Sequence, residues 1–232
     1  MGEKILEAGH TCVIVCAGDF ALADIPFSPG KGDMCIAADG GYRYCRQLGM
    51  EPDLVIGDMD SLGEQLRSEL EHWKEDTPEK VRILSPEKDD TDTLAAIKEG
   101  LAAGYRSFCL YGALGGRLEH TVANMQCLAY LKNHGAEGCI MDEGVMMTVI
   151  KNETICFPET MEGYLSLFSL WEKAEGVTIR GMKYLLKDAQ VSHDFPIGIS
   201  NEFIGERGEI TVKNGMLLLI AAAYRQGIRF VR

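Results

Sequence analysis

The sequence lacks the motifs that identify the most common nucleotide-binding proteins. No Gly-x-x-x-x-Gly-Lys-Ser/Thr segment occurs, which excludes a P-loop, and no Gly-x-Gly-x-x-Gly follows an expected strand, which excludes a dinucleotide fingerprint. It also has no Cys-x-x-Cys pair and no histidine spacing typical of a transition-metal site. Any phosphate or metal chemistry must therefore come from other residues.

Long apolar runs and positive charge are also scarce. No apolar run approaches the roughly 20 residues that cross a bilayer, and the first residues lack the apolar centre of a signal peptide. The chain has 23 Lys and Arg against 35 Asp and Glu, a net charge of −12. This balance argues against a nonspecific nucleic-acid or anionic-membrane surface. A polyphosphate ligand is not excluded, because bound divalent cations invert the local charge.

Eight cysteines are present, and most of them lie inside apolar runs. Buried, reduced thiols that pack as small hydrophobic side chains explain this placement better than a disulfide framework does. Together with the missing signal peptide, this predicts a cytoplasmic protein.

Residues 1–142 alternate between apolar strand-like runs and longer helical segments. Such alternation predicts parallel βαβ units with right-handed crossovers, and hence an α/β domain with a mainly parallel sheet and flanking helices. Some helical character also follows Asp19. We expect strands over 12–17, 34–38, 54–56, 81–84, 107–111 and 138–141, and helices over 41–48, 64–74, 91–103 and 117–134.

Residues 143–232 carry short strand-like runs separated by turn pairs, and no helix of convincing length. Asn214-Gly215 between two apolar runs is a strong hairpin signal. We therefore expect a separate all-β sandwich domain over these residues. The expected strands are 145–150, 154–157, 164–170, 176–179, 184–186, 199–204, 209–212 and 216–221.

Acidic residues follow several of the expected parallel strands. Asp58 and Asp60 come directly after the strand 54–56, and Asp39 follows the strand 34–38. Since the carboxyl ends of parallel strands share one edge, where open α/β sheets bind ligands, these carboxylates are expected to converge. Carboxylates with open positions for water and phosphate oxygens suit Mg²⁺. Each cluster alone is equally compatible with a turn whose Asp side chains cap the next helix.

A third acidic cluster, Lys88-Asp89-Asp90-Thr91-Asp92, follows the expected strand 81–84. Acidic residues are also natural at a helix N-terminus, where the helix dipole favours negative charge, so capping is the more frequent explanation of such a cluster when it is taken alone. Recurrence at three strand ends favours metal-assisted phosphoryl chemistry.

The segment 112–120 joins an expected strand to a long helix and contains three glycines. Glycines there allow a ligand to approach the backbone, and the amides at the helix start bind anions. Arg117 is suited to contact phosphate oxygens. A plain glycine turn with a surface arginine is the simpler alternative.

These motifs, in this order and spacing, resemble the bacterial thiamine pyrophosphokinases over nearly the whole chain. Each motif is short, and the specificity comes from their combination. The matching segments are Ala38-Asp39-Gly40-Gly41, residues 52–61 with Gly57-Asp58-Met59-Asp60-Ser61, residues 88–92, residues 112–120 with Asn124, and Gly198-Ile199-Ser200-Asn201-Glu202-Phe203.

The resemblance implies transfer of a diphosphoryl group from ATP to the hydroxyl of thiamine, by attack on the β-phosphorus, with AMP and thiamine diphosphate as products. It also implies Mg²⁺ as cofactor, ATP as co-substrate and a homodimer with thiamine bound between protomers. No nucleic-acid or membrane partner is expected.

The resemblance assigns roles to residues as well. The implied catalytic residues are Asp92, Lys88 and Arg117; the metal ligands Asp39, Asp58, Asp60 and Asp92; the ATP-binding residues Gly40, Gly41, Lys88, Thr91 and Arg117; and the thiamine-binding residues Asp89, Glu119, His120, Ser200 and Asn201. The family usually has Asp where this chain has Glu119, so a carboxylate contact with thiamine would have a different geometry here.

Two other functions use the same residues. A thiamine or thiamine diphosphate sensor would keep the fold without turnover, although it would not need Lys88, Arg117 and the acids. A metal-dependent nucleotide phosphohydrolase would use the acids but would not need the segment with Ser200 and Asn201.

Overall fold

The computed structural model describes residues 4–5, 10–19, 30–85, 87, 89–142, 144–222 and 229–231. These residues form two compact units. The α/β unit contains residues 10–127 and 140–143, and the β unit contains residues 128–139 and 144–232 together with the N-terminal residues. Helix α4 (Leu118–Asn133) and strand β7 (Glu137–Asp142) contribute residues to both. The expected domain boundary after residue 142 stays a prediction.

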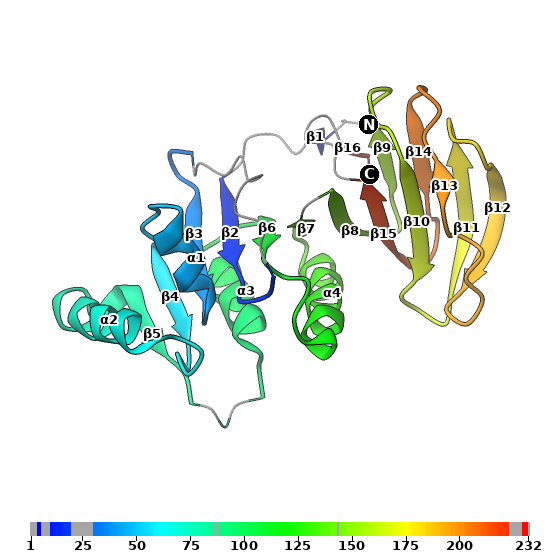
Figure 1. Ribbon diagram of the computed structural model, residues 1–232. Coiled ribbons are helices and arrows are strands. Elements are labelled where there is room, and N and C mark those ends of the chain that lie inside the picture. The colour runs from blue at the N-terminus through cyan, green and yellow to red at the C-terminus, as the bar shows by residue number, and fades with distance from the viewer. Residues whose placement is uncertain are drawn as a thin grey trace. The chain divides into compact units, whose positions relative to one another are not determined.

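The α/β unit is built on a parallel sheet with strand order β6-β2-β3-β4-β5 (Figure 1). All neighbouring pairs in this series are parallel. Strands β2, β3 and β4 are short runs buried on both faces, as expected when helices cover a sheet, whereas β5 at the edge exposes Arg82 and Ile83. The strands are β2 (Thr11–Val15), β3 (Met34–Ala38), β4 (Leu54–Gly57), β5 (Val81–Ile83) and β6 (Ser107–Tyr111).

Because neighbouring strands in this series are parallel, their carboxyl ends all lie at the same edge of the sheet. The helices are α1 (Gly41–Gln47), α2 (Glu64–Asp76), α3 (Asp92–Ala102) and the first part of α4, with a 3-10 turn η2 (Pro78–Lys80) before β5. The predicted mainly parallel α/β fold is therefore confirmed.

The β unit is an antiparallel sandwich, which confirms the second half of the predicted fold class. One sheet has the order β1-β16-β9-β14-β11-β12, and the other contains β13-β10-β15-β8. The strands are β1 (Lys4–Ile5), β8 (Val145–Lys151), β9 (Thr154–Phe157), β10 (Tyr164–Ser169), β11 (Lys173–Arg180), β12 (Leu186–Ser192), β13 (Asn201–Glu202), β14 (Gly208–Thr211), β15 (Met216–Ala222) and β16 (Arg229–Val231).

Apolar side chains from both sheets form the core of the β unit. Phe157 is fully buried and meets Phe203 edge to face, with the ring centroids 5.4 Å apart. The chain turns at Asn214-Gly215, where Gly215 has a φ of 126° and β15 follows directly. The hairpin expected there is wrong, because β14 pairs with β9 and β11 in one sheet and β15 pairs with β8 and β10 in the other.

The strand expected over residues 184–186 is wrong, because β12 begins at Leu186 and continues to Ser192. Part of the segment expected to be helical after Asp19 falls on residues 20–29, outside the described residues. Among the residues that the structure describes, no helix is long and apolar enough to cross a membrane.

Candidate functional site

The loop after β3 presents Asp39. This residue adopts a left-handed φ of 47°, and its backbone N–H donates to the Ile56 carbonyl of the neighbouring strand at 2.8 Å. Its own carbonyl accepts the Tyr42 N–H at the start of α1. Backbone hydrogen bonds on both sides therefore fix the position from which the Asp39 carboxylate projects.

The loop after β4 presents Asp58 and Asp60. Gly57 packs so closely on the first loop that an added Cβ would come within 2.9 Å of the Asp39 Cα. Met59, between the two acids, adopts a φ of 61° and buries its side chain in the core. Because the Met59 side chain points into the protein, the two neighbouring carboxylates lie on either side of an anchored residue.

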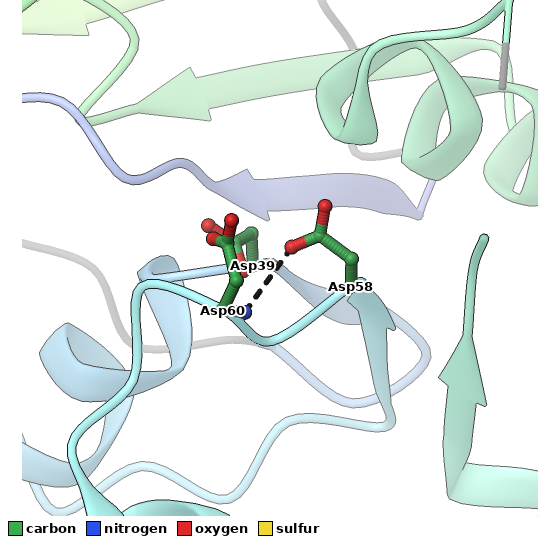
Figure 2. A group of neighbouring side chains, drawn as sticks. All are labelled: Asp39, Asp58 and Asp60. Carbon is green, nitrogen blue, oxygen red and sulfur yellow. Dashed lines mark hydrogen bonds between the residues drawn. The ribbon is translucent and has the colours of Figure 1, made fainter. Parts of the chain in front are cut away.

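Asp39, Asp58 and Asp60 form what we call the acidic group. Each offers a carboxylate oxygen, and these oxygens all lie within 4.8 Å of one another. Figure 2 shows the three carboxyl groups pointing to the same side of the loops that carry them, with the Asp60 N–H donating to Asp58 Oδ1 at 3.1 Å. Mutual repulsion is the expected result in the absence of a cation.

The electrostatics of the acidic group are consistent with that geometry. The pKa of Asp60 is raised above its usual value, first by the negative charge of Asp58 and then by desolvation and by Asp39. Ser61 Oγ donates to Asp39 Oδ2 at 2.7 Å, whereas Asp39 Oδ1 is buried and has no hydrogen-bond partner among the described residues. A divalent cation would neutralise the carboxylates and give that oxygen a partner.

The cluster after β5 is divided among different roles. Thr91 is the N-cap of α3, and its Oγ1 accepts the Leu94 N–H at 3.2 Å. Asp90 pairs with Lys98 at 2.6 Å, and Asp89 is exposed. Asp92 lies in the first turn of α3 and does not belong to the acidic group as defined above, and Lys88 lies outside the described residues. Thr91 is therefore the N-cap, and Asp92 occupies the first turn, where the helix dipole favours negative charge.

The glycine loop before α4, residues 112–117, bends at Gly112, Gly115 and Gly116, which have φ values of 60°, 75° and 60°. The Asp19 carboxylate accepts the Gly116 N–H at 3.0 Å, and a Cβ on Gly115 would meet that same carboxylate at 2.4 Å. The buried Asn124 side chain donates to the Ala113 carbonyl at 2.8 Å. The glycines are therefore required by the fold of the loop, whether or not it binds a ligand.

Arg117 and Glu119 project from the start of α4 and are both largely exposed. Arg117 Nε lies 2.7 Å from Glu119 Oε1. The pKa of Glu119 is lowered, first by a hydrogen bond from its own backbone N–H and then by Arg117. His120 is exposed on the same turn. The Glu119 carboxylate is thus paired with Arg117 and constrains the direction of the guanidinium group.

Gly40 and Gly41 have a packing explanation. A Cβ on Gly41 would lie 1.9 Å from the Val15 carbonyl oxygen, and one on Gly40 would lie 2.8 Å from Ser61 Oγ. Gly41 therefore allows α1 to approach β2, and Gly40 allows it to approach the loop that carries Ser61. Packing alone accounts for both glycines, and the expected role in ATP binding would be additional to it.

Ser200 and Asn201, both in the β unit, differ in burial and in their hydrogen bonds. Asn201 is buried; its Oδ1 accepts the Tyr184 N–H at 2.9 Å and its Nδ2 donates to the Tyr184 carbonyl at 2.7 Å. Ser200 is exposed with a left-handed φ of 56°, and its N–H donates to Ser166 Oγ. The Asn201 amide is therefore a structural tie to the Tyr184 backbone.

Sequence reasoning missed Asp19 and Arg67, which hold the two site loops through backbone groups. Arg67 donates to the carbonyls of Met59 and Asp60, and Asp19 accepts from Gly116. Contacts with backbone groups leave no residue-type pattern in a single sequence, so no sequence signal pointed to either residue.

These features define the class of the protein: a parallel α/β unit with polar side chains gathered at the carboxyl edge of its sheet, where such sheets bind ligands, joined in one chain to an antiparallel β-sandwich. Residues 30–140 match the family model of the thiamin pyrophosphokinase catalytic domain, and residues 152–217 match that of the thiamin pyrophosphokinase vitamin B1 binding domain. The chain belongs to the thiamine pyrophosphokinase family of enzymes.

Individual relatives agree with both matches. The thiamine pyrophosphokinase of Bacillus subtilis is 27% identical over 221 residues, which covers 90% of this chain and 97% of the relative. The crystal structure of a thiamin pyrophosphokinase from Geobacillus thermodenitrificans is similar with a TM-score of 0.76 at 25% identity, covering 93% of this chain and 99% of that one. A thiamin pyrophosphokinase family protein from Enterococcus faecalis gives 0.75 at 26% identity, covering 94% and 100%.

Proposed function

We propose that this protein transfers a diphosphoryl group from ATP to the hydroxyl of thiamine and releases thiamine diphosphate and AMP. The thiamine oxygen forms a bond to the β-phosphorus, and the bond from the β-phosphorus to the oxygen bridging to the α-phosphate breaks. Family membership supports thiamine as the substrate. We also propose a cytoplasmic location, which the free and mostly buried cysteines favour.

One observation carries the proposed magnesium requirement. The buried Asp39 Oδ1, which has no partner among the described residues, belongs to a group of carboxylates that repel one another. Asp39, Asp58 and Asp60 fit Mg²⁺, and Asp92 is proposed as a further ligand on the family resemblance. When bound, the ion would neutralise charge on the phosphate oxygens. The protein's own contribution is to hold these carboxylates at fixed positions.

The remaining residues are proposed to bind the substrates. Arg117, exposed and oriented by Glu119, is suited to donate several hydrogen bonds to phosphate oxygens. Lys88, Thr91, Gly40 and Gly41 are proposed for ATP. Asp89, Glu119, His120, Ser200 and Asn201 are proposed for thiamine, and for Asn201 we favour its backbone or an indirect role, because its side chain is engaged with Tyr184. A homodimer with thiamine between protomers is part of the same proposal.

Product analysis by mass tests the reaction. The protein is incubated with ATP, Mg²⁺ and thiamine, and AMP and thiamine diphosphate should appear in equal amounts. ADP with thiamine monophosphate would instead mean attack on the γ-phosphorus and would overturn the mechanism. Loss of ATP that does not require thiamine would indicate a phosphohydrolase, and thiamine binding without turnover would indicate a sensor.

A pair of variants controls that experiment. Asp58→Asn removes one charge of the acidic group but keeps Oδ1, which accepts the Asp60 N–H. Asp76→Asn removes a charge from an exposed residue at the end of α2. We expect only Asp58→Asn to abolish product formation.

A further inference from the structure

Arg67, on the second turn of α2, contacts the backbone of the loop that carries two of the three acidic residues. Its Nε donates to the Met59 carbonyl at 2.9 Å, and its Nη2 donates to the Asp60 carbonyl at 2.5 Å. The planar guanidinium thus bridges two successive carbonyl groups. Its own backbone N–H is used within the helix, where it donates to the Gly63 carbonyl, so the side chain extends from a fixed helical position.

The loop needs such support for two reasons. Met59 has a left-handed φ of 61°, a strained conformation for a residue with a side chain, and it persists only where the surroundings enforce it. On either side of Met59, the carboxylates of Asp58 and Asp60 have oxygens within 4.8 Å of one another and repel. Strain and repulsion both favour a more open loop when no cation is bound.

Two anchors oppose that opening. The Met59 side chain is only 6% exposed and packs in the core with Leu62 and Leu70. The Met59 carbonyl, on the same residue, is held by Arg67. Packing of the Met59 side chain keeps Met59 attached to the core. The hydrogen bonds from Arg67 fix the orientation of the two peptide groups on either side of Asp60.

We propose that Arg67 is a positioning residue for the acidic group: its two hydrogen bonds to the Met59 and Asp60 carbonyls hold Asp58 and Asp60 at the spacing that a divalent cation requires. This inference rests on the proposed metal-dependent function and names a further residue of that site. Arg67 acts through the loop backbone and makes no contact with the cation.

Because Arg67 is positively charged, the direction in which its removal changes metal affinity tests its role. A guanidinium near three carboxylates repels an incoming cation, so an arginine that acted only through its charge would weaken metal binding. Removing it would then strengthen binding. Loss of a residue that orients metal ligands has the opposite effect and typically weakens metal binding about 10- to 100-fold. The direction of the change therefore separates the two roles.

Arg67 also lines a cavity of about 240 Å³ together with Asp58, Asp60, Leu70 and Ile83. A direct contact between Arg67 and a bound nucleotide would change the KM for ATP, but it would leave binding of a metal ion alone unaffected. The decisive measurement is therefore made without nucleotide.

The experiment is calorimetric titration of the full chain with Mn²⁺ in the absence of ATP, on the wild type and three variants. Arg67→Ala removes the charge and both hydrogen bonds. Arg67→Lys keeps the charge but replaces the planar fork by a single ammonium group. Arg106→Ala is the matched control, because Arg106 also donates to two backbone carbonyls of the same unit, those of Leu101 and Tyr105, and it precedes β6, at the amino end of that strand.

We expect Arg67→Ala to bind Mn²⁺ about 10- to 100-fold more weakly and Arg67→Lys to lie between it and the wild type, with Arg106→Ala unchanged. Unchanged or tighter binding by Arg67→Ala, or wild-type binding by Arg67→Lys, would overturn the inference. Thermal unfolding of each variant checks the fold, and Arg67→Lys carries the test if Arg67→Ala does not fold.

Failure of this inference is distinguishable from failure of the proposed function. If the wild type makes thiamine diphosphate and binds Mn²⁺ while the Arg67 variants bind it equally well, only the positioning role is wrong. If the wild type neither binds Mn²⁺ nor forms product, the proposed function fails and the inference fails with it. A positioning role also predicts that excess Mg²⁺ restores most of the turnover of Arg67→Lys.

Discussion

Ser61 Oγ donates a 2.7 Å hydrogen bond to Asp39 Oδ2, and this bond connects the loop after β4 to the loop after β3. It satisfies one oxygen of the Asp39 carboxylate. The other, Oδ1, is buried without a hydrogen-bond partner among the described residues. An unsatisfied buried acceptor costs the folded state about 1–3 kcal/mol, so the protein retains a group that is costly unless something binds there.

The first prediction concerns the two oxygens of Asp39. Asp39→Asn keeps an acceptor for Ser61 but removes the charge, and we expect it to lower both Mn²⁺ affinity and turnover about 100-fold or more. Ser61→Ala leaves the charge and loosens only its orientation, so we expect a loss of about tenfold. Calorimetry and steady-state rates compare the two variants. Equal effects would mean that the charge of Asp39 is not what the site uses.

The second prediction concerns stability and pH in the metal-free protein. The pKa of Asp60 is raised in the folded state, chiefly by Asp58. The unfolded chain therefore loses this proton at lower pH than the folded chain does. The stability of the metal-free fold should fall as pH rises from the ordinary Asp range through the raised pKa of Asp60.

Thermal unfolding of metal-free wild type and Asp58→Asn, followed from acidic to neutral pH, measures this effect. Asp58→Asn removes the main cause of the raised pKa, so its melting temperature should exceed that of the wild type increasingly as pH rises. Mg²⁺ at neutral pH should stabilise the wild type more than the variant. A wild type that is the more stable of the two at neutral pH without metal would contradict the prediction.

The sequence predicted those parts of the fold in which one residue pattern dominates. Apolar runs located β6 and β9 at the residues where the structure has them, because buried strands need apolar side chains on consecutive positions. Strand β12 was misplaced because it pairs on one side only, with β11, and carries exposed polar residues such as Lys187 and Asp188. An edge strand of this kind has no apolar signature.

In the candidate site, too, the residues that follow a sequence pattern were predicted and the others were not. Asp39, Asp58 and Asp60 were expected together because they follow neighbouring parallel strands, and the structure brings their oxygens within 4.8 Å. Asp92 was expected with them, but it is the first residue of α3, in the connection that follows β5 rather than β3 or β4. Arg67 could not be expected, because its partners are backbone carbonyls, which every residue possesses.

The third prediction separates Asn201 from Ser200. Asn201→Ala removes two part-buried hydrogen bonds to the Tyr184 backbone, so we expect a loss of about 1–3 kcal/mol in the free energy of unfolding. Ser200 is exposed, and its hydrogen bond to Ser166 uses the backbone N–H, so Ser200→Ala should change stability by less than about 0.5 kcal/mol. Denaturant unfolding measures both. Similar values for the two variants would show that the Asn201 side chain is not a structural tie.

The fourth prediction concerns Lys132, near the end of α4, whose Nζ contacts the carboxylates of Glu137 and Glu153. The side chains of Lys132 and Glu153 are only 4% and 3% exposed. Lys132→Ala would leave a buried carboxylate without its cation, and we expect a loss of about 3–5 kcal/mol in the free energy of unfolding.

Lys98 provides the contrast for this prediction, because its pair with Asp90 is 44% and 34% exposed. Exposed pairs contribute about 0–1 kcal/mol, so Lys98→Ala should cost little. The double variant Lys132→Met with Glu153→Gln removes the more deeply buried of the two carboxylate charges and leaves that of Glu137, which is 18% exposed, so it should recover much of the stability lost in Lys132→Ala. Burial, rather than the number of ion pairs, would then determine the stabilisation; comparable losses for Lys98→Ala and Lys132→Ala in denaturant unfolding would disprove that explanation.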